Sequence, residues 1–285
     1  MTENANEKTL KYRAKAVNSH DFNSPVFFDR YAVLDVNPYA SAFAYGRKKL
    51  YEKMNRIIDD RLDGKGDVLE AACGTGYYIK VLRANGYNVT GVEPADGMRE
   101  RAQKKNPKTE IKNGVISALP FPDNTFDAVT SIELFRYLEA ADIKQGYAEI
   151  LRVLKPGGFA VVTLVNRYAL DGFLFSYYFK LMLEKYFGKP IINYCDAVSP
   201  SETEKYFKDN FNVVASTESA MFAPLRIIYK LYPKLGEWCA KRLESFDEKL
   251  NQTDWHKKFA GHLIVVIEKK ADAKENTNTA PVRHI

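Results

Sequence analysis

The feature that most constrains this chain is a short apolar segment that runs directly into a glycine-rich turn. The segment VLEAACGTG, at residues 68–76, indicates a buried strand and a turn, and a helical pattern starts near Tyr77. Glycines at such a turn let the backbone approach a ligand closely. Nineteen residues after Gly74, a second apolar segment ends at Glu93, whose carboxylate can accept hydrogen bonds from both hydroxyls of a ribose. Together the two features predict a nucleoside-binding crevice.

Further apolar runs alternate with helical patterns along most of the chain. The runs expected to form strands are 67–71, 88–92, 126–130, 158–163, 212–215 and 262–267. Such alternation predicts an α/β fold with a doubly wound, mostly parallel sheet. An apolar stripe at helical spacing predicts a helix over 142–154. The sequence Ser199-Pro-Ser-Glu202 combines a cap residue, a first-turn proline and a carboxylate, which predicts a helix from Pro200 to about Lys208.

The composition indicates one large globular domain, or one domain with additions. The chain has 285 residues and a formal charge of +6, and its three cysteines show no paired metal spacing. We expect no metal site and no disulfide scaffold. We interpret residues 1–25 as a flexible or lid-forming arm, 26–270 as the domain with helical insertions at about 168–198 and 221–258, and 271–285 as a disordered tail.

No segment suggests export, membrane insertion or nucleic-acid binding. The first 17 residues are polar and lack the apolar core of a signal peptide. The most apolar window, 169–183, includes Asp171 and Lys180 and is shorter than the ~20 residues that a spanning helix needs. A charge of +6 over this length is mild. We therefore expect a cytoplasmic protein whose partner is a small molecule.

A dinucleotide-binding reductase is the main competing interpretation of the glycine turn. If Gly74 and Gly76 were the first two glycines of its fingerprint, the third would fall at position 79, which is Ile79. The carboxylate of Glu70, at the end of the first strand, would also repel a pyrophosphate and attract a cation. Both observations favour a cationic, amino-acid-bearing ligand.

Over about residues 27–216 and the final strand, the chain resembles the class I S-adenosylmethionine-dependent methyltransferases, in particular the group similar to ubiquinone and menaquinone C-methyltransferases (methyltransferase domain 11 type). The segment LEAACGTG resembles that family's first motif, with Ala72 in place of a glycine. The segment NGVISALPFPDNTFD, at 113–127, resembles its adenine loop, with Val115 in place of an acid, so backbone groups or Ser117 would contact the adenine amine. The segment LRVLKPGG, at 151–158, matches its last block.

The resemblance implies a seven-stranded sheet whose last strand, 262–268, is antiparallel and lies beside 212–216. It also implies S-adenosyl-L-methionine as cofactor, with an aromatic residue of the N-terminal segment over it and Glu93 on its ribose. Arg47 would bind the methionine carboxylate, or would be an ordinary surface arginine. The candidate cofactor-binding residues are Tyr31, Arg47, Glu70, Ala72, Cys73, Gly74, Gly76, Glu93, Pro94, Met98, Val115, Ile116 and Ser131.

Methyl transfer needs mainly the alignment of nucleophile, methyl group and sulfur, so a general base is optional. Glu133, after the fourth strand, is the first candidate base, and His20 and His262 are the others. Each could instead have a structural role. The function that the resemblance implies is methylation of a small, apolar or lipid-like acceptor. The alternatives are methylation of tRNA or protein, and a non-catalytic nucleoside-binding subunit.

The two insertions would cover the acceptor. The first, 168–196, is rich in aromatic residues that could line an apolar pocket or form a buried helical hairpin. The second, 221–250, has apolar residues near helical spacing beside Arg226, Lys230 and Lys234. A basic stripe beside an apolar face is typical of a helix at a membrane surface, but also of a packed helix with a solvated basic face.

Overall fold

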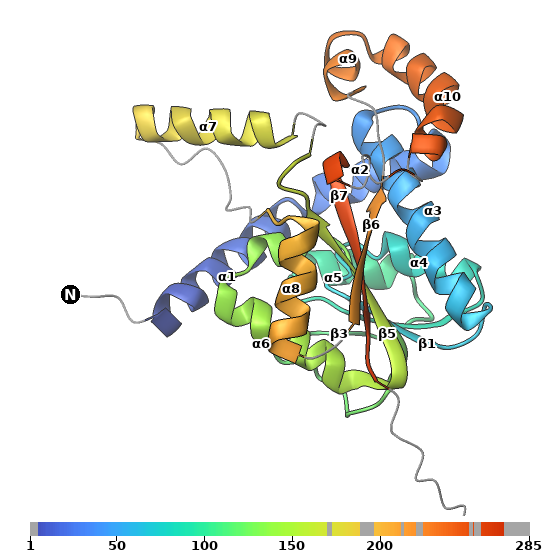
Figure 1. The fold of residues 1–285 in the computed structure, drawn as a ribbon, viewed down its shortest axis with the longest axis vertical. Coiled ribbons are helices and arrows are strands. Elements are labelled where there is room, and N and C mark those ends of the chain that lie inside the picture. The colour runs from blue at the N-terminus through green and yellow to red at the C-terminus, as the bar shows by residue number, and fades with distance from the viewer. Residues whose placement is uncertain are drawn as a thin grey trace, which may run out of the picture.

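The computed structural model of the chain describes residues 5–169, 173–188, 197–211, 214–220, 225–250, 253 and 258–270. A central sheet has seven strands within these ranges (Figure 1). The strands are β1 (Asp67–Ala71), β2 (Asn88–Val92), β3 (Ile111–Lys112), β4 (Phe126–Ser131), β5 (Leu154–Val165), β6 (Val214–Ala220) and β7 (His262–Glu268). Their order is β3-β2-β1-β4-β5-β7-β6, and β7 is antiparallel to both of its neighbours. The predicted seven-stranded sheet with an antiparallel last strand is confirmed.

Helices cover both faces of the sheet and extend beyond it at one end (Figure 1). They are α1 (Ala5–Phe22), α2 (Ser24–Val36), α3 (Ala42–Leu62), α4 (Tyr77–Ala84), α5 (Asp96–Lys105), the short 3₁₀ helix η1 (Phe135–Tyr137), α6 (Ala140–Val153), α7 (Phe173–Phe187), α8 (Pro200–Phe211), α9 (Leu225–Leu231) and α10 (Pro233–Leu250). No helix in the described ranges is long and apolar enough to cross a membrane.

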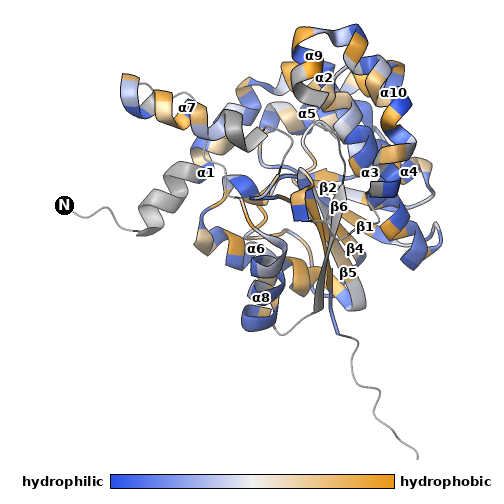
Figure 2. Ribbon diagram, turned by 45° about the horizontal axis from the view of Figure 1, so that its top comes forward, coloured by the Kyte–Doolittle hydropathy of each residue, from blue (hydrophilic) through white to orange (hydrophobic). Residues whose placement is uncertain are grey.

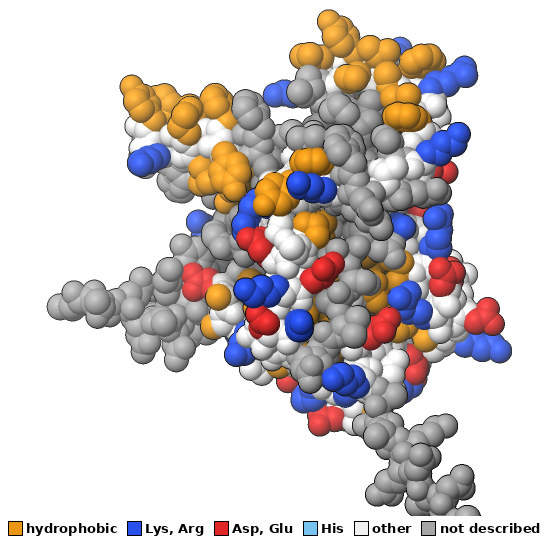
Figure 3. All heavy atoms as spheres, in the orientation of Figure 1, with side chains coloured by type: hydrophobic (Ala, Val, Ile, Leu, Met, Phe, Trp, Pro, Cys, Tyr) orange, Lys and Arg blue, Asp and Glu red, His pale blue; other side chains and the backbone are white. Residues whose placement is uncertain are grey.

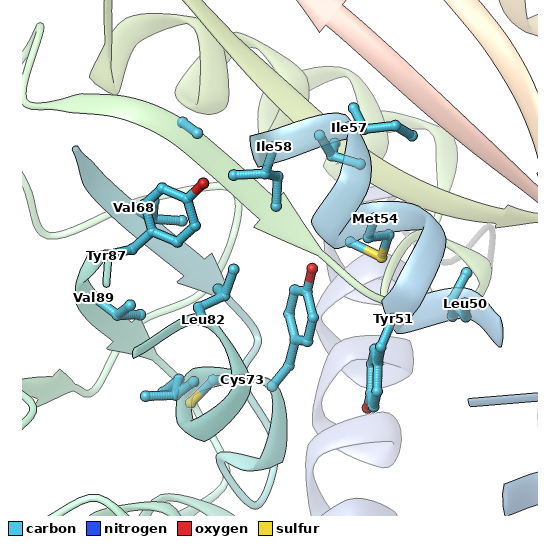
Figure 4. Packing of buried hydrophobic residues seen from close by; sticks show 14 of the residues in the cluster. Leu50, Tyr51, Met54, Ile57, Ile58, Val68, Cys73, Leu82, Tyr87 and Val89 are labelled. Carbon is cyan, nitrogen blue, oxygen red and sulfur yellow. The ribbon is translucent and has the colours of Figure 1, made fainter. Parts of the chain in front are cut away.

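The core consists of two layers, one on each face of the sheet. Alternate side chains of a strand point to opposite faces, so Val68 of β1 packs with α3 and α4, whereas Leu69 packs with α6. The strands are accordingly hydrophobic along most of their length (Figure 2). In the layer beneath α3, Met54 and Ile58 are fully buried against Leu82 of α4 (Figure 4). This packing fixes the turn between β1 and α4.

The observed boundaries agree closely with the sequence for the short elements. Strand β1 and the helix predicted at Pro200 begin as expected, and the Ser199 amide donates to Glu202 at 2.9 Å, which completes the predicted cap. Strand β5 is longer than the expected 158–163, and the described part of β6 runs from Val214 to Ala220. Strand β3 was not predicted, because its two residues are too few to show a pattern.

A helix occupies most of the segment expected as a flexible or lid-forming arm. Helix α1 packs against α5, α2 and η1. The Arg13 guanidinium bonds the Asp142 carboxylate at the start of α6, and the Gly97 amide donates to Asp21 at 2.5 Å. Helix α1 therefore bridges the two halves of the sheet. The tail at 271–285 lies outside the described residues.

Candidate functional site

A large cleft opens at the carboxyl ends of β1, β2 and β4. It encloses about 1240 Å³, a volume that includes the space at its open mouth. Its floor is the turn after β1, and its walls come from α1, α3 and the segments around Glu93 and η1.

The turn after β1 has the left-handed backbone that its glycines favour. Ala72, Gly74 and Gly76 have φ values of 58°, 54° and 74°. At Gly74 a Cβ would meet nothing within 4 Å, so the turn leaves open space above it. At Gly76 a Cβ would lie 2.6 Å from Nδ2 of Asn106, so this glycine serves the packing of α4 against α5.

Glu93 ends β2 and faces the same turn. Its two carboxylate oxygens accept hydrogen bonds from the Gly74 amide at 2.9 Å and the Ala95 amide at 3.0 Å. Burial raises the pKa of Glu93, although these two amides oppose the rise. The bonds hold the carboxylate in one orientation at the cleft, where its remaining lone pairs can accept bonds from a ligand.

Glu70 lies at the end of β1 and is almost completely buried. Burial raises the pKa of Glu70 to about 8, and a hydrogen bond from the Thr130 hydroxyl opposes this rise. At neutral pH Glu70 is therefore mainly in its neutral form. A cationic ligand beside it would favour the carboxylate.

An ionic cluster lies at the end of β4, where Glu133 has a φ of 55°. Its carboxylate contacts Nη2 of Arg47 at 2.9 Å, Nε2 of His262 at 2.5 Å and Nη1 of Arg136 at 3.5 Å. Burial alone would raise the pKa of Glu133, but Arg47, His262 and Arg136 hold it well below its usual value. Glu133 is therefore a carboxylate, and a weak proton acceptor, over the neutral range.

Two polar atoms beside the cleft lack a hydrogen-bond partner within the described part of the chain. Nη1 of Arg47 and Oγ1 of Thr75 are both buried, and both residues line the cleft. Leaving such an atom unbonded costs ~1 to 3 kcal/mol. A ligand carboxylate or hydroxyl bound here would remove this cost.

His20 of α1 is the histidine that lines the cleft. Its Nδ1 lies 2.8 Å from the Ala16 carbonyl oxygen, which can only accept, so Nδ1 carries the proton. The neutral ring then has its lone pair on Nε2. Phe27 stacks on the ring and Tyr137 meets it edge-on, and these contacts fix its orientation.

The family comparison agrees with this geometry. The family described as "Methyltransferase domain" matches residues 69–162, which run from β1 into β5. A demethylmenaquinone methyltransferase of Staphylococcus aureus is 30% identical over 184 residues, which are 61% of this chain and 72% of that protein. The chain belongs to the class I S-adenosylmethionine-dependent methyltransferases.

Other relatives of this methyltransferase match over shorter stretches. A demethylmenaquinone methyltransferase of Chlorobaculum tepidum is 35% identical over 147 residues, 50% of this chain and 59% of that protein. The chain spans about half the length of the curated relatives it matches.

The fold has matches among solved structures at low sequence identity. One is a chain in a complex between the Haloferax volcanii Trm112 methyltransferase activator and a putative methyltransferase. It has a TM-score of 0.57 at 18% identity and covers 88% of this chain and 97% of that chain. The match shows a shared fold.

Most of the site residues predicted for the methyltransferase lie together on the cleft. These are His20, Tyr31, Arg47, Glu70, Ala72, Cys73, Gly74, Glu93, Pro94, Met98, Val115, Ile116 and Glu133. Gly76, Ser131 and His262 are not among the described residues that line the cleft. Gly76 packs against α5, Ser131 is buried within β4, and His262 contacts Glu133.

Sequence reasoning also missed residues that line the cleft, among them Arg13, Thr75, Tyr51 and Tyr78. Thr75 lies inside the glycine motif and could have been found there. Tyr51 and Tyr78 stack on each other at 4.7 Å from two different helices, a pairing that only the tertiary fold shows.

The aromatic insertion was expected to line the acceptor pocket or to form a buried helical hairpin. Tyr178, Phe179, Tyr186 and Phe187 of α7 are exposed and are not among the described residues that line the cleft. Leu134, Tyr137 and Leu138, around η1, form the apolar wall instead. The helical pattern of α7 gave no information about which surface it would face.

Proposed function

We propose that the chain transfers a methyl group from S-adenosyl-L-methionine to a small, apolar or lipid-like acceptor in the cytoplasm. The observation that carries the proposal is the position of three groups on one cleft. The open turn at Gly74, the oriented carboxylate of Glu93 and the unpaired Nη1 of Arg47 all lie there.

Each part of the cofactor has a suitable group on the cleft. Arg47 and Thr75 would satisfy their unpaired atoms on the carboxylate end of the ligand, and Glu93 would accept the ribose hydroxyls. The apolar side chains that would hold the adenine are those of Pro94, Met98, Val115 and Ile116. Ser117 accepts a bond from Arg13 at 3.0 Å, so its hydroxyl is already held in place.

The cofactor supplies a methyl group on a positively charged sulfur. The residues of the chain have to orient the acceptor and exclude water. Helix α1 covers the cleft, and Leu134 and Leu138 supply an apolar wall. The stacked rings of Tyr31, Tyr77 and Tyr51 contribute electron-rich faces, which favour a cation nearby.

We assign the role of general base to His20 ahead of Glu133. His20 lines the cleft and has its lone pair on Nε2, whereas the Glu133 carboxylate is held by Arg47, Arg136 and His262. Glu133 then acts as a positioning residue, because it fixes Nη2 of Arg47 and leaves Nη1 for the ligand. His262 also contacts the Glu133 carboxylate and helps to hold it in place.

The apolar wall supports an acceptor with a flat or aliphatic body. Several relatives are named demethylmenaquinone methyltransferases. This likeness supports an acceptor that is a ring-containing apolar molecule.

Calorimetry with S-adenosylhomocysteine tests the cofactor assignment. Glu93→Ala should weaken binding by ~2 to 4 kcal/mol, because two hydrogen bonds to a charged group are lost. The matched control is Glu110→Ala, which changes an exposed glutamate beside β3. An unchanged dissociation constant in Glu93→Ala, or tight NAD binding by the wild type, would contradict the proposal.

A further inference from the structure

Helices α9 and α10 present an apolar surface that is turned away from the domain. Trp238 and Phe246 of α10 are 57% and 58% exposed, although each is a large apolar side chain. Together with Leu231, Tyr232 and Leu235, which are also exposed, they form what we call the docking face. Exposed apolar surface of this extent indicates an interaction site.

The spacing of residues on α10 places large apolar side chains on the outer side of the helix and small residues on the side that packs against the domain. Leu235, Trp238, Arg242 and Phe246 follow one another at steps of three and four, so they share one side of the helix. The opposite side holds Gly236 and Ala240, both buried in the contact with Tyr229 and α3. The outward apolar residues are therefore not needed for packing on the domain.

Three acids of α10 contact the domain. Glu237 accepts from Asn37 at 3.1 Å, Glu244 accepts from Tyr39 at 2.5 Å, and Glu248, whose side chain is 54% exposed, pairs with Lys49 at 2.9 Å.

The basic residues around the docking face are exposed instead. They are Lys230, Lys234, Arg242 and Lys249. The Arg242 guanidinium lies 5.9 Å from the Trp238 ring, which joins charge and apolar surface in one place. The surface that surrounds the apolar residues is thus positive.

The docking face lies at the end of the molecule that carries the cleft. Strands β5 and β6 both run antiparallel to β7, so their carboxyl ends lie at one edge of the sheet, and α9 follows β6 there. β4, parallel to β5, ends at the same edge beside the cleft.

Helix α7 follows β5 at this edge and exposes Tyr178, Met182 and Tyr186. Figure 3 shows hydrophobic side chains gathered over both α7 and α9–α10, at the same end of the molecule. A flat apolar partner could contact both regions.

We propose that the docking face binds an anionic lipid bilayer, with Trp238 and Phe246 inserted at the interface and the surrounding basic residues on the headgroups. Aromatic residues beside lysine and arginine on the outer side of a helix suit such an interface, and Glu237, Glu244 and Glu248 are each engaged by a residue of the domain. The inference rests on the proposed function, because a lipid-like acceptor would then reach the cleft from the bilayer.

The test is cosedimentation with vesicles at low salt, where charge attraction is least screened. Vesicles of equal parts phosphatidylcholine and phosphatidylglycerol are compared with pure phosphatidylcholine. Wild type should sediment with the anionic vesicles and much less with the neutral ones. The variant Arg242→Glu/Lys249→Glu should bind at least ~tenfold more weakly, since each basic residue near the surface contributes ~1 kcal/mol.

Two further variants separate specific docking from general charge. Trp238→Ser/Phe246→Ser should also lose binding, because it removes apolar area. The control Lys144→Glu/Lys205→Glu makes the same change of charge at exposed positions on α6 and α8, and should bind as wild type does. Thermal unfolding and S-adenosylhomocysteine binding are measured on every variant.

Three outcomes would overturn the inference. The first is wild-type protein that fails to sediment with the anionic vesicles, and the second is a control variant that loses binding as fully as the docking-face variants. The third is a wild-type protein that self-associates through this face, so that Trp238→Ser/Phe246→Ser abolishes the self-association and leaves vesicle binding unchanged. If S-adenosylhomocysteine binds normally in any of these cases, the membrane inference fails and the proposed function stands.

Discussion

Replacing Glu70 by glutamine should change how the stability of the protein depends on pH. The wild-type carboxyl is almost completely buried and accepts a hydrogen bond from Thr130, which glutamine can also accept. The substitution therefore keeps shape and bonding while it removes the titration. Burial raises the pKa of Glu70 to about 8 in the folded chain, against an ordinary value of 4.5.

The sign and size of the effect follow from these two values. At pH values between these two pKa values, the folded chain binds one more proton at Glu70 than the unfolded chain does. The free energy of unfolding therefore falls as pH rises. The contribution is fully present below pH 4.5 and is lost through about pH 8. At ~1.4 kcal/mol for each pKa unit, the loss is on the order of 5 kcal/mol.

Urea unfolding without ligand, at a series of pH values from 4 to 9, measures this loss. The free energy of unfolding of Glu70→Gln should increase relative to that of wild type as pH rises. Glu110→Gln, at an exposed position, should run parallel to wild type. Stability curves for Glu70→Gln that stay parallel to wild type between about pH 4.5 and 8 would refute the reasoning.

Three further substitutions test individual residues of the site. His20→Ala should lower the single-turnover rate by ~100-fold and leave S-adenosylhomocysteine binding unchanged, and a loss below ~tenfold would remove His20 as the base. Arg47→Lys keeps a positive charge near Glu133 but lacks the second donor arm, so it should weaken S-adenosylhomocysteine binding ~tenfold or more in calorimetry; an unchanged affinity would show that Nη1 does not bind the ligand. Ala72→Gly should raise the free energy of unfolding by up to ~1 kcal/mol, because the left-handed backbone at this position is costly for alanine; a destabilised variant in urea unfolding would show that the Ala72 methyl group contributes to packing.

The sequence predicted the elements whose signals are local. The turn at Gly74 and the acid at Glu93 are fixed by spacing along two adjacent strands, and the structure brings them to 2.9 Å. Arg47 and Tyr31 lie far from the glycine turn in the chain, and only the resemblance predicted that they would contact the same ligand. Both line the cleft.

The remaining features depend on contacts that no local pattern encodes. The position of Glu133 after β4 suggested a base, but its partners Arg47 and His262 come from α3 and β7, and their charges decide its protonation. The aromatic pattern of α7 was clear in the sequence. Whether those rings face a cleft or solvent depends on where the helix leaves the sheet.

The most direct test of the central claim is conversion of the cofactor. The protein is incubated with S-adenosylmethionine and a lipid extract, and mass spectrometry follows S-adenosylhomocysteine and the extracted molecules. We predict that S-adenosylhomocysteine accumulates over many turnovers and that one class of apolar molecules gains a methyl group, and that Glu93→Ala loses both signals. S-adenosylmethionine that binds tightly but is never consumed, with any of the acceptors offered, would contradict the claim and indicate a non-catalytic nucleoside-binding protein.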